Sequence, residues 1–319
     1  MNIKQKKISC EFLGALLFLL VFLLLTAACG KAPEGYIDFR RSQAEQPKNE
    51  AGKEQRPLTI AVAAVISPQE TIDGYRVIAE RISKLTGHPT ALIQRKTYEE
   101  INTLLANGAA DMAFISTGAY SAYRGMQEID LLAMAELDGN ILYTTDIIVH
   151  ADSDIQSFDD LKGRTFAFTD PLSYSGHVAI ENLLWQENTS PGKFFKRYFY
   201  TYNHDKSIWA VSNRLVDAAS IDSQIYEYAL RHNPELAKNI RIIESKNPSP
   251  TGPVVIRRAL PDAQKKELQQ IFLQLHQDPA TAKAMHRLMI DRFVLPQPDL
   301  YLPLKEIYDR MSTRYENNA

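Results

Sequence analysis

The pattern of apolar and polar residues from position 57 onward predicts alternating strands and helices. Residues 58–65 form a run of apolar and small residues, typical of a strand buried on both faces. Residues 67–87 open with Ser-Pro-Gln-Glu, place apolar residues at helical spacing and end on a glycine, which predicts an amphipathic helix. A strand, a helix and a strand follow, at residues 90–94, 98–106 and 111–115. This βαβαβ order predicts a parallel sheet with helices on both faces.

A second block of the same kind follows two further predicted strands, at residues 131–135 and 141–150. The block comprises strands at 164–168, 216–222 and 240–243, an aromatic run at 194–202, and helices between them. The turn-forming residues 249–253 predict a return crossing, so that strand 254–256 rejoins the first sheet. Three helical patterns would then finish the chain against the first lobe, at 261–276, 279–292 and 304–314. We therefore expect an α/β protein of two lobes, each a mostly parallel sheet flanked by helices, joined by a two-segment hinge.

The N-terminus has the pattern of a secretory signal. Lysines at positions 4, 6 and 7 precede an apolar run at 13–25, and small residues lead to Cys29. The run is short for a membrane span, which needs about 20 residues. A cysteine directly after small residues resembles a bacterial lipoprotein signal, although Thr26 stands where an aliphatic residue is usual. An uncleaved anchor helix is the alternative, and it would also hold the protein at a membrane.

Composition narrows the possible functions of the part that follows the signal. The chain has formal charge −2, and residues 1–28 carry three Lys and one Glu, so the remainder has charge −4. Scattered charges with a mildly acidic balance make a nucleic-acid partner a poor expectation. The only cysteines are Cys10 and Cys29, so no disulfide forms within the mature chain. The predicted regions are a signal peptide at 1–28, a flexible tether at 29–56, lobe I at 57–148 and 250–319, and lobe II at 149–249.

One strand-to-helix connection in the second lobe has the chemistry of an anion site. Strand 164–168 leads through a proline turn to Ser173, Tyr174, Ser175, Gly176 and His177, at the start of an amphipathic helix. The first N–H groups of a helix lack intrahelical partners and lie at the positive end of its dipole. Serine hydroxyls add donors, and glycine permits close approach to the backbone. An ordinary serine-capped helix is the alternative.

A similar connection follows the third strand of the first lobe. There the predicted ligand-binding residues are Ser116, Thr117 and Tyr120. Ligands of open α/β sheets bind at the carboxyl ends of the strands, where both connections lie. In the second lobe, His204 stands next to Asp205, after a strand-like run and before a predicted helix, and we include His204 and Asp217 in the predicted site. Alternatively, Asp217 holds His204 or a hydroxyl group in position without contacting the ligand, or it simply ends a strand. Asp222 and Ser223 are predicted to cap the next helix.

Several of these segments together resemble a known family. The set comprises residues 108–114, Ser173 to Gly176, His204 with Asp205, and residues 216–218. In this order and spacing they are similar to the phosphate/phosphite/phosphonate-binding proteins of ABC transporters, over residues 58–292. The resemblance implies a type II-like periplasmic binding protein that closes on its ligand. It implies that Ser173, Ser175 and Gly176 hold the oxyanion, with His204 and Tyr120 adding hydrogen bonds.

The resemblance also implies partners and one departure. The protein would be an extracytoplasmic, lipid-anchored monomer that delivers its ligand to an ABC permease, without a metal or another cofactor. Members that take aminoalkylphosphonates use acidic residues to hold the amine, one of them in the return crossing, where this chain has Thr251 and Gly252. The expectation is therefore phosphite, phosphate or a short alkylphosphonate. The bulky Tyr174 stands where a small hydroxyl residue is common.

Two other classes of protein remain open at this point. A serine hydrolase would use the hydroxyl, imidazole and carboxylate of Ser175, His204 and Asp217, but the sequence lacks Gly-x-Ser-x-Gly. A ligand-sensing ectodomain that signals to a membrane kinase would use the same two closing lobes. The sequence does not distinguish that sensor from a transport protein.

Overall fold

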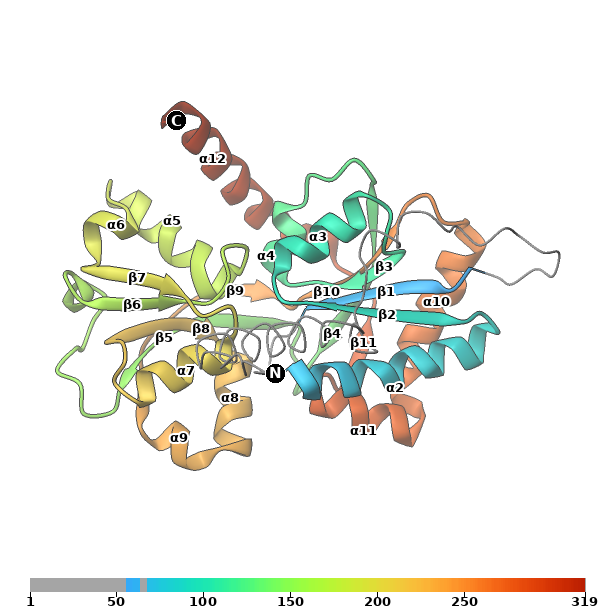
Figure 1. The fold of residues 1–319 in the computed structure, drawn as a ribbon, viewed down its shortest axis with the longest axis horizontal. Coiled ribbons are helices and arrows are strands. Elements are labelled where there is room, and N and C mark those ends of the chain that lie inside the picture. Colours follow the sequence, from blue (N-terminus) through green and yellow to red (C-terminus); the bar gives the residue numbers. More distant parts are fainter. Residues whose placement is uncertain (1–55, 64–67, 319) are drawn as a thin grey trace, which may run out of the picture. The chain divides into compact units, whose positions relative to one another are not determined.

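The computed structural model describes residues 56–63 and 68–318. The predicted signal peptide at 1–28, the predicted tether up to residue 55 and Cys29, the predicted site of lipid attachment, lie outside these residues. Among the described helices, none combines the length and apolar character needed to cross a membrane. The described strands form two separate sheets, each flanked by helices (Figure 1).

The first sheet has six strands in the order β11-β4-β10-β3-β1-β2. Their bounds are β1 Leu58–Ala63, β2 Thr90–Arg95, β3 Met112–Phe114, β4 Ile129–Glu136, β10 Pro253–Arg257 and β11 Arg292–Val294. β1 pairs in parallel with β2 and β3, as the βαβαβ order predicts. β10 runs antiparallel to β3 and β4, and β11 runs antiparallel to β4.

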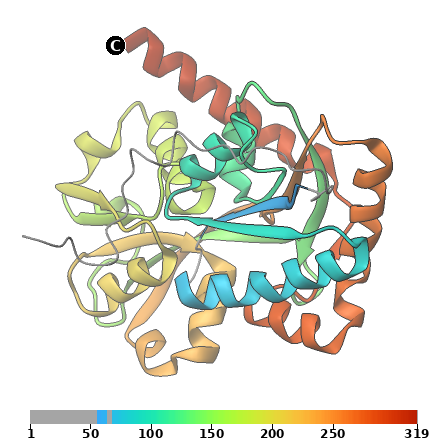
Figure 2. The same ribbon diagram turned by 45° about the vertical axis from the view of Figure 1, so that its right-hand side comes forward.

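Both faces of the first sheet are buried, which explains the continuous apolar run of β1. Leu58, Ile60 and Val62 pack into one core, while Ala61 and Ala63 pack into the core on the opposite face. The first face is covered by α2 (Pro68–Thr86), α10 (Asp262–Gln274) and α11 (Pro279–Arg287), and Figure 2 shows α2 beside α11. The other face is covered by α3 (Tyr98–Ala106) and α4 (Thr117–Ala122).

The second sheet has five strands in the order β7-β6-β8-β5-β9. Their bounds are β5 Leu142–His150, β6 Thr165–Phe168, β7 Arg197–Tyr200, β8 Ala218–Asp222 and β9 Ile240–Pro250. Three are parallel, and β5 runs antiparallel to both of its neighbours. One face carries α7 (His204–Ser212), α8 (Ser223–His232) and α9 (Pro234–Lys238), and the other carries α5 (Ala179–Gln186) and α6 (Pro191–Phe194).

The chain passes between the two sheets twice, from β4 to β5 and from β9 to β10. The two crossings touch, because the N–H of Thr251 donates to the carbonyl oxygen of Ile141 at 2.9 Å. All of β5 pairs within the second sheet, whereas the predicted division after residue 148 cuts through it. We therefore propose that the lobe boundary lies at residues 137–141.

Three late elements differ from the sequence prediction. The predicted helix 279–292 ends at Arg287, and the chain then forms the short edge strand β11. The predicted strand 240–243 extends to Pro250 along β5. The last helix, α12 (Leu302–Asn318), does not pack on the first lobe alone: Leu304, Tyr308 and Met311 cluster with Tyr174, Val178 and Ala179 of the second lobe.

Candidate functional site

A cavity of about 130 Å³ lies between the two sheets, among the connections that follow several of their strands. Its lining comes from both lobes. Close contacts surround it: the N–H of Tyr98 donates to the Asp170 carboxylate at 3.2 Å, and Arg231 pairs with Asp138 at 2.7 Å. A β-carbon on Gly118 would collide with the carbonyl oxygen of Leu172. The structure therefore has the two lobes closed on one another.

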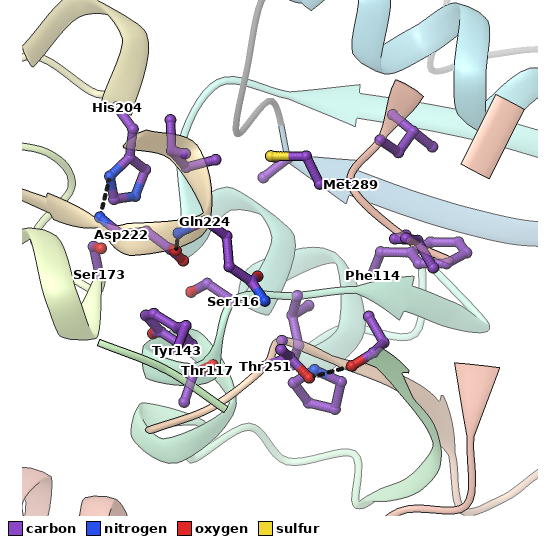
Figure 3. Close-up of a pocket in the computed structure, with 18 of the residues that line it drawn as sticks. Phe114, Ser116, Thr117, Tyr143, Ser173, His204, Asp222, Gln224, Thr251 and Met289 are labelled. Carbon is purple, nitrogen blue, oxygen red and sulfur yellow. Dashed lines mark hydrogen bonds between the residues drawn. The ribbon is translucent and has the colours of Figure 1, made fainter. Parts of the chain in front are cut away.

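Polar groups from four helix starts converge on this cavity. Ser116 and Thr117 belong to the start of α4, and Ser173 and Ser175 to the turn that precedes α5. The starts of α7 and α8 contribute His204 and Asp222 (Figure 3). Helix N-termini present N–H donors and partial positive charge. None of the described lining residues is Lys or Arg, so any anion here would be held by neutral donors and dipoles.

The turn before α5 is the short π-helical segment η3 (Tyr174–Val178). Its cap is Ser173, whose side-chain oxygen accepts from the N–H of Gly176 at 3.0 Å. A β-carbon on Gly176 would lie 2.5 Å from Cβ of Thr169, so only glycine lets the turn pack this closely on the end of β6. With that N–H used by the cap, the backbone N–H groups of Tyr174 and Ser175 are the first of the helix and are suited to bind an oxyanion.

Tyr143 lines the cavity and links the turn that contains Thr117 with the turn that contains Ser175. Its buried hydroxyl interacts with the side chains of Thr117 in the first lobe and Ser175 in the second. Burial raises the pKa of Tyr143, and these two hydroxyl groups act in the opposite direction. Burial likewise raises the pKa of Tyr98, which also lines the cavity. Both phenols are therefore neutral and can donate hydrogen bonds to an anion.

His204 presents a donor to the cavity as a neutral imidazole. Its Nδ1 atom accepts from the backbone N–H of Asp222 at 3.2 Å, as Figure 3 shows. An imidazole that accepts at Nδ1 and is neutral carries its proton on Nε2. Burial lowers the pKa of His204 to about 3, so the ring stays neutral at physiological pH.

Asp222 is the acidic side chain among the described residues of this lining. It caps α8 by accepting from the N–H of Gln224 at 2.7 Å. Burial raises the pKa of Asp222 to about 7, although that hydrogen bond acts in the opposite direction. Near neutral pH the carboxyl can therefore keep a proton, and a protonated carboxyl donates a hydrogen bond.

The structure brings six of the ten predicted ligand-binding residues to this cavity. They are Ser116, Thr117, Ser173, Tyr174, Ser175 and His204. The buried ring of Tyr174 also packs against α12, and its hydroxyl interacts with Ser249. Gly176 lies behind the lining and shapes the turn.

The structure places the other predicted residues elsewhere, which corrects their assignment to the site. Tyr120 packs edge-on against Tyr301 in the first-lobe core. His177 turns away, and its Nδ1 lies 2.9 Å from the carbonyl oxygen of Pro171. Asp217 accepts from the N–H of Thr165 at 2.7 Å and joins the starts of β6 and β8. Ser175, His204 and Asp217 therefore do not form a hydrolytic triad.

Sequence reasoning missed Tyr98, Tyr143, Asp222 and Gln224 as lining residues. The prediction that Asp222 caps a helix is confirmed, but its position at the end of β8 also places it in the cavity. Tyr98 follows β2 in the same way. The strand-end rule that selected Ser116 could have found both. Tyr143 lies inside a crossing strand and carries no such signal. Among the described residues no group of three or more His, Cys, Asp or Glu side chains could hold a metal.

The fold has two α/β lobes, the chain passes between them twice, and a cavity lies between them. This arrangement defines the class of two-lobed periplasmic binding proteins. Residues 60–301 match the sequence model of the ABC transporter phosphonate periplasmic substrate-binding proteins. The match covers most of the chain, so this protein belongs to that family, whose members are transport binding proteins and not enzymes.

Individual relatives agree with this assignment. The phosphonates-binding periplasmic protein of Escherichia coli strain K12 is 29% identical over 157 residues, which are 47% of this chain and 46% of that protein. The chain therefore aligns with about half the length of this curated relative. A binding protein of an ABC phosphonate transporter from Pseudomonas aeruginosa has a similar fold, with TM-score 0.72 and 24% identity over 79% of this chain and 86% of that one. A Prochlorococcus marinus protein in complex with methylphosphonate also has TM-score 0.72, at 18% identity over 80% and 98% of the chains.

Proposed function

We propose that the protein captures a small phosphonate or a related phosphorus oxyanion in the cavity and delivers it to an ABC permease. The observation that carries this proposal is the convergence of helix N-termini, serine hydroxyls and the Nε2–H of His204 on one closed cavity. Hydrogen bonds to a charged group contribute about 1.5–3 kcal/mol each. Five or six of them, offset in part by desolvation of the ligand, support micromolar binding or better.

Asp222 bears on which oxyanion is bound. The phosphorus oxyanion and the Asp222 carboxylate repel one another when both are fully ionised. Binding therefore favours a state in which one proton lies between the two groups. A partly protonated phosphonate or phosphite can share a proton with Asp222, whose pKa is about 7. Thr251 and Gly252 still leave the return crossing without a carboxylate, and both line the cavity. We therefore keep phosphite, phosphate and unaminated alkylphosphonates as the proposed ligands.

Isothermal titration with phosphite, phosphate, methylphosphonate and 2-aminoethylphosphonate tests the proposal. We expect binding of at least one of the first three, and weaker binding of the aminated ligand. If none of the four compounds binds, the proposed ligand is wrong, and only the family assignment stands. Tight binding of only 2-aminoethylphosphonate would show instead that Asp222 holds an ammonium group.

The proposed lipid anchor and partner have separate tests. The lipoprotein-like signal supports attachment through Cys29, so a Cys29→Ser chain should lose acyl labelling and fractionate without lipid. Continued labelling would refute the anchor. The protein is proposed to act as a monomer with a permease, and co-purification with a membrane kinase would favour the sensor alternative instead.

A further inference from the structure

The connection between β6 and η3 contacts the first lobe at three places. The Asp170 carboxylate accepts from the N–H of Tyr98, the first residue of α3, at 3.2 Å. The carbonyl oxygen of Leu172 accepts from the hydroxyl of Tyr308 in α12 at 3.1 Å. A β-carbon on Gly118 of α4 would collide with that same carbonyl oxygen. Three elements of the first lobe therefore hold the short connection that leads into the binding turn.

The two carboxylate oxygens of Asp170 serve different lobes. Oδ1 accepts from the N–H of Leu172 at 2.8 Å, and the Asp170 carbonyl oxygen accepts from the N–H of Ser173 at 2.8 Å. Both of these bonds lie within the second lobe and form the turn that precedes η3. Oδ2 instead accepts from Tyr98 of the first lobe. The turn bonds are thus independent of lobe closure, whereas the bond from Tyr98 requires that the lobes meet.

The N–H of Tyr98 is well suited to receive a carboxylate. Thr97 caps α3, and its side chain accepts from the N–H of Glu100 at 3.2 Å. The N–H of Tyr98 has no partner inside the helix and lies at the positive end of the helix dipole. Glu99 and Glu100 repel the Asp170 carboxylate, so the hydrogen bond must offset that repulsion. A residue of the second lobe therefore completes the cap of a first-lobe helix.

Burial makes this hydrogen bond important for closure. Asp170 is only 2% exposed. Burial raises the pKa of Asp170, and the hydrogen bonds from the N–H groups of Leu172 and Tyr98 act in the opposite direction. A buried carboxylate costs free energy unless hydrogen bonds replace the water that it loses. Closure around Asp170 therefore depends on the acceptor at Oδ2 meeting the donor on Tyr98.

We infer that Asp170 is a positioning residue for ligand capture, whose carboxylate binds the N–H of Tyr98 on closure and so joins two walls of the cavity. Tyr98 forms part of one wall, and the turn that carries Ser173 and Ser175 forms part of the other. Asp170 is not among the described residues of the lining, so it acts on the ligand through these neighbours. The inference rests on the proposed function, because it assumes that closure captures the oxyanion.

Asp170→Asn in the full chain tests the inference. If the amide oxygen keeps the bond from Leu172, the amide nitrogen faces the N–H of Tyr98, and two donors then oppose one another. The dissociation rates of phosphite and methylphosphonate should rise about tenfold or more, because closure leaves a buried donor without an acceptor. Their association rates should change less than about twofold, because the ligand enters before the bond forms. Stopped-flow fluorescence measures both rates.

Asp160→Asn is the matched control. The Asp160 carboxylate accepts from the N–H groups of Gln156 and Ser157 on the exposed side of the second lobe, so the change should alter neither rate. Amide hydrogen exchange gives a second readout. Bound methylphosphonate should slow exchange at the N–H of Tyr98 in the wild type and in Asp160→Asn, but much less in Asp170→Asn.

A purely local role of Asp170 in its turn predicts different results. It predicts a lower denaturant midpoint for the ligand-free Asp170→Asn protein and an unchanged dissociation rate, and this result would overturn the inference. Asp170→Ser offers a second route if Asp170→Asn folds poorly, because a serine hydroxyl can keep the turn but is too short to reach Tyr98.

Asp170→Ser should also raise the dissociation rates. Wild-type rates in the folded variants would overturn the inference and leave the proposed function intact. Absence of binding of both ligands by the wild type would overturn both.

Discussion

Two serines that follow strands of the two sheets make the same local hydrogen bond but have different neighbours. The side chains of Ser116 and Ser173 each accept from the N–H three residues later, at 3.1 and 3.0 Å. Beyond Ser116, the Thr117 hydroxyl donates to the carbonyl oxygen of Pro250 and Gly118 packs on Leu172. Beyond Ser173, Ser175 lies at the cavity beside Tyr143. The turn at Ser116 thus mainly joins the two lobes, whereas the turn at Ser173 presents Ser175 to a ligand in the cavity.

This difference shows that a serine at the end of a strand indicates where a site lies, but not whether that serine binds the ligand or joins the two lobes. Both turns reach the cavity, yet α4 has only six residues and its first turn is committed to contacts between the lobes. η3 continues directly into α5, so its N-terminal N–H groups belong to a longer run of aligned peptide dipoles. We therefore expect substitutions in the two turns to have separable effects on closure, affinity and stability.

The largest effect is expected from a side chain at Gly118. Gly118→Val would place a branched side chain against Leu172 and within 2.7 Å of the Tyr174 nitrogen, which prevents the two turns from meeting. Overpacking of this kind costs about 1–3 kcal/mol, and the upper value would weaken ligand binding roughly 100-fold. Titration calorimetry measures the loss. Gly192→Ala, where a β-carbon meets no atom within 4 Å, is the control.

The next largest effect is expected at Ser175. Ser175→Ala removes a buried hydroxyl at the cavity and should weaken oxyanion binding by about 1–3 kcal/mol. Ser116→Ala removes a helix cap and should lower the unfolding free energy by about 1 kcal/mol with a smaller loss of affinity. Calorimetry and denaturant titration of both variants make the comparison. Equal losses of affinity would show that the two turns bind the ligand alike.

Asp222→Asn should change how affinity depends on pH. The wild-type carboxyl loses its proton above a pKa of about 7, so its affinity for an anion relative to the variant should fall about tenfold from pH 6 to pH 8. The ligand's own titration is common to both proteins and cancels in the ratio. A ratio independent of pH would contradict the proposed shared proton.

The same substitution has a consequence for stability. The folded pKa of Asp222 lies above its ordinary value of 3.8, so the wild type loses stability as pH rises from about 4 to about 7. Asn keeps the cap of α8 without this loss. Thermal unfolding without ligand should therefore show that Asp222→Asn is more stabilising at pH 8 than at pH 4.

The smallest effect is expected at Tyr120, which sequence reasoning placed in the site. Its ring packs against Tyr301, and Lys305 lies 4.5 Å from the ring centroid. Tyr120→Phe keeps that packing, so ligand affinity should stay within about 0.5 kcal/mol of the wild type. Tyr143→Phe removes a hydroxyl at the cavity and serves as the comparison variant. Its ligand affinity should be measurably lower than that of the wild type. The opposite order of effects would return Tyr120 to the site.

Local patterns sufficed for the two α/β blocks and for the turns after β3 and β6. The apolar run of β1 and the serine caps are encoded by neighbouring residues, as is the cap made by Asp222. The strand β11 was missed because it has three residues and pairs with β4 far back in the chain. Sequence reasoning selected Tyr120 instead of Tyr143 for a related reason: which tyrosine faces the cavity depends on how the two lobes meet, and no local pattern encodes that contact.

A structure of the protein with bound methylphosphonate tests the central claim most directly. We predict that its oxygens lie within hydrogen-bonding distance of the Ser175 hydroxyl, the N–H groups at the start of η3, and Nε2 of His204. Phosphonate bound away from these groups, beside Tyr120 or His177, would contradict the account.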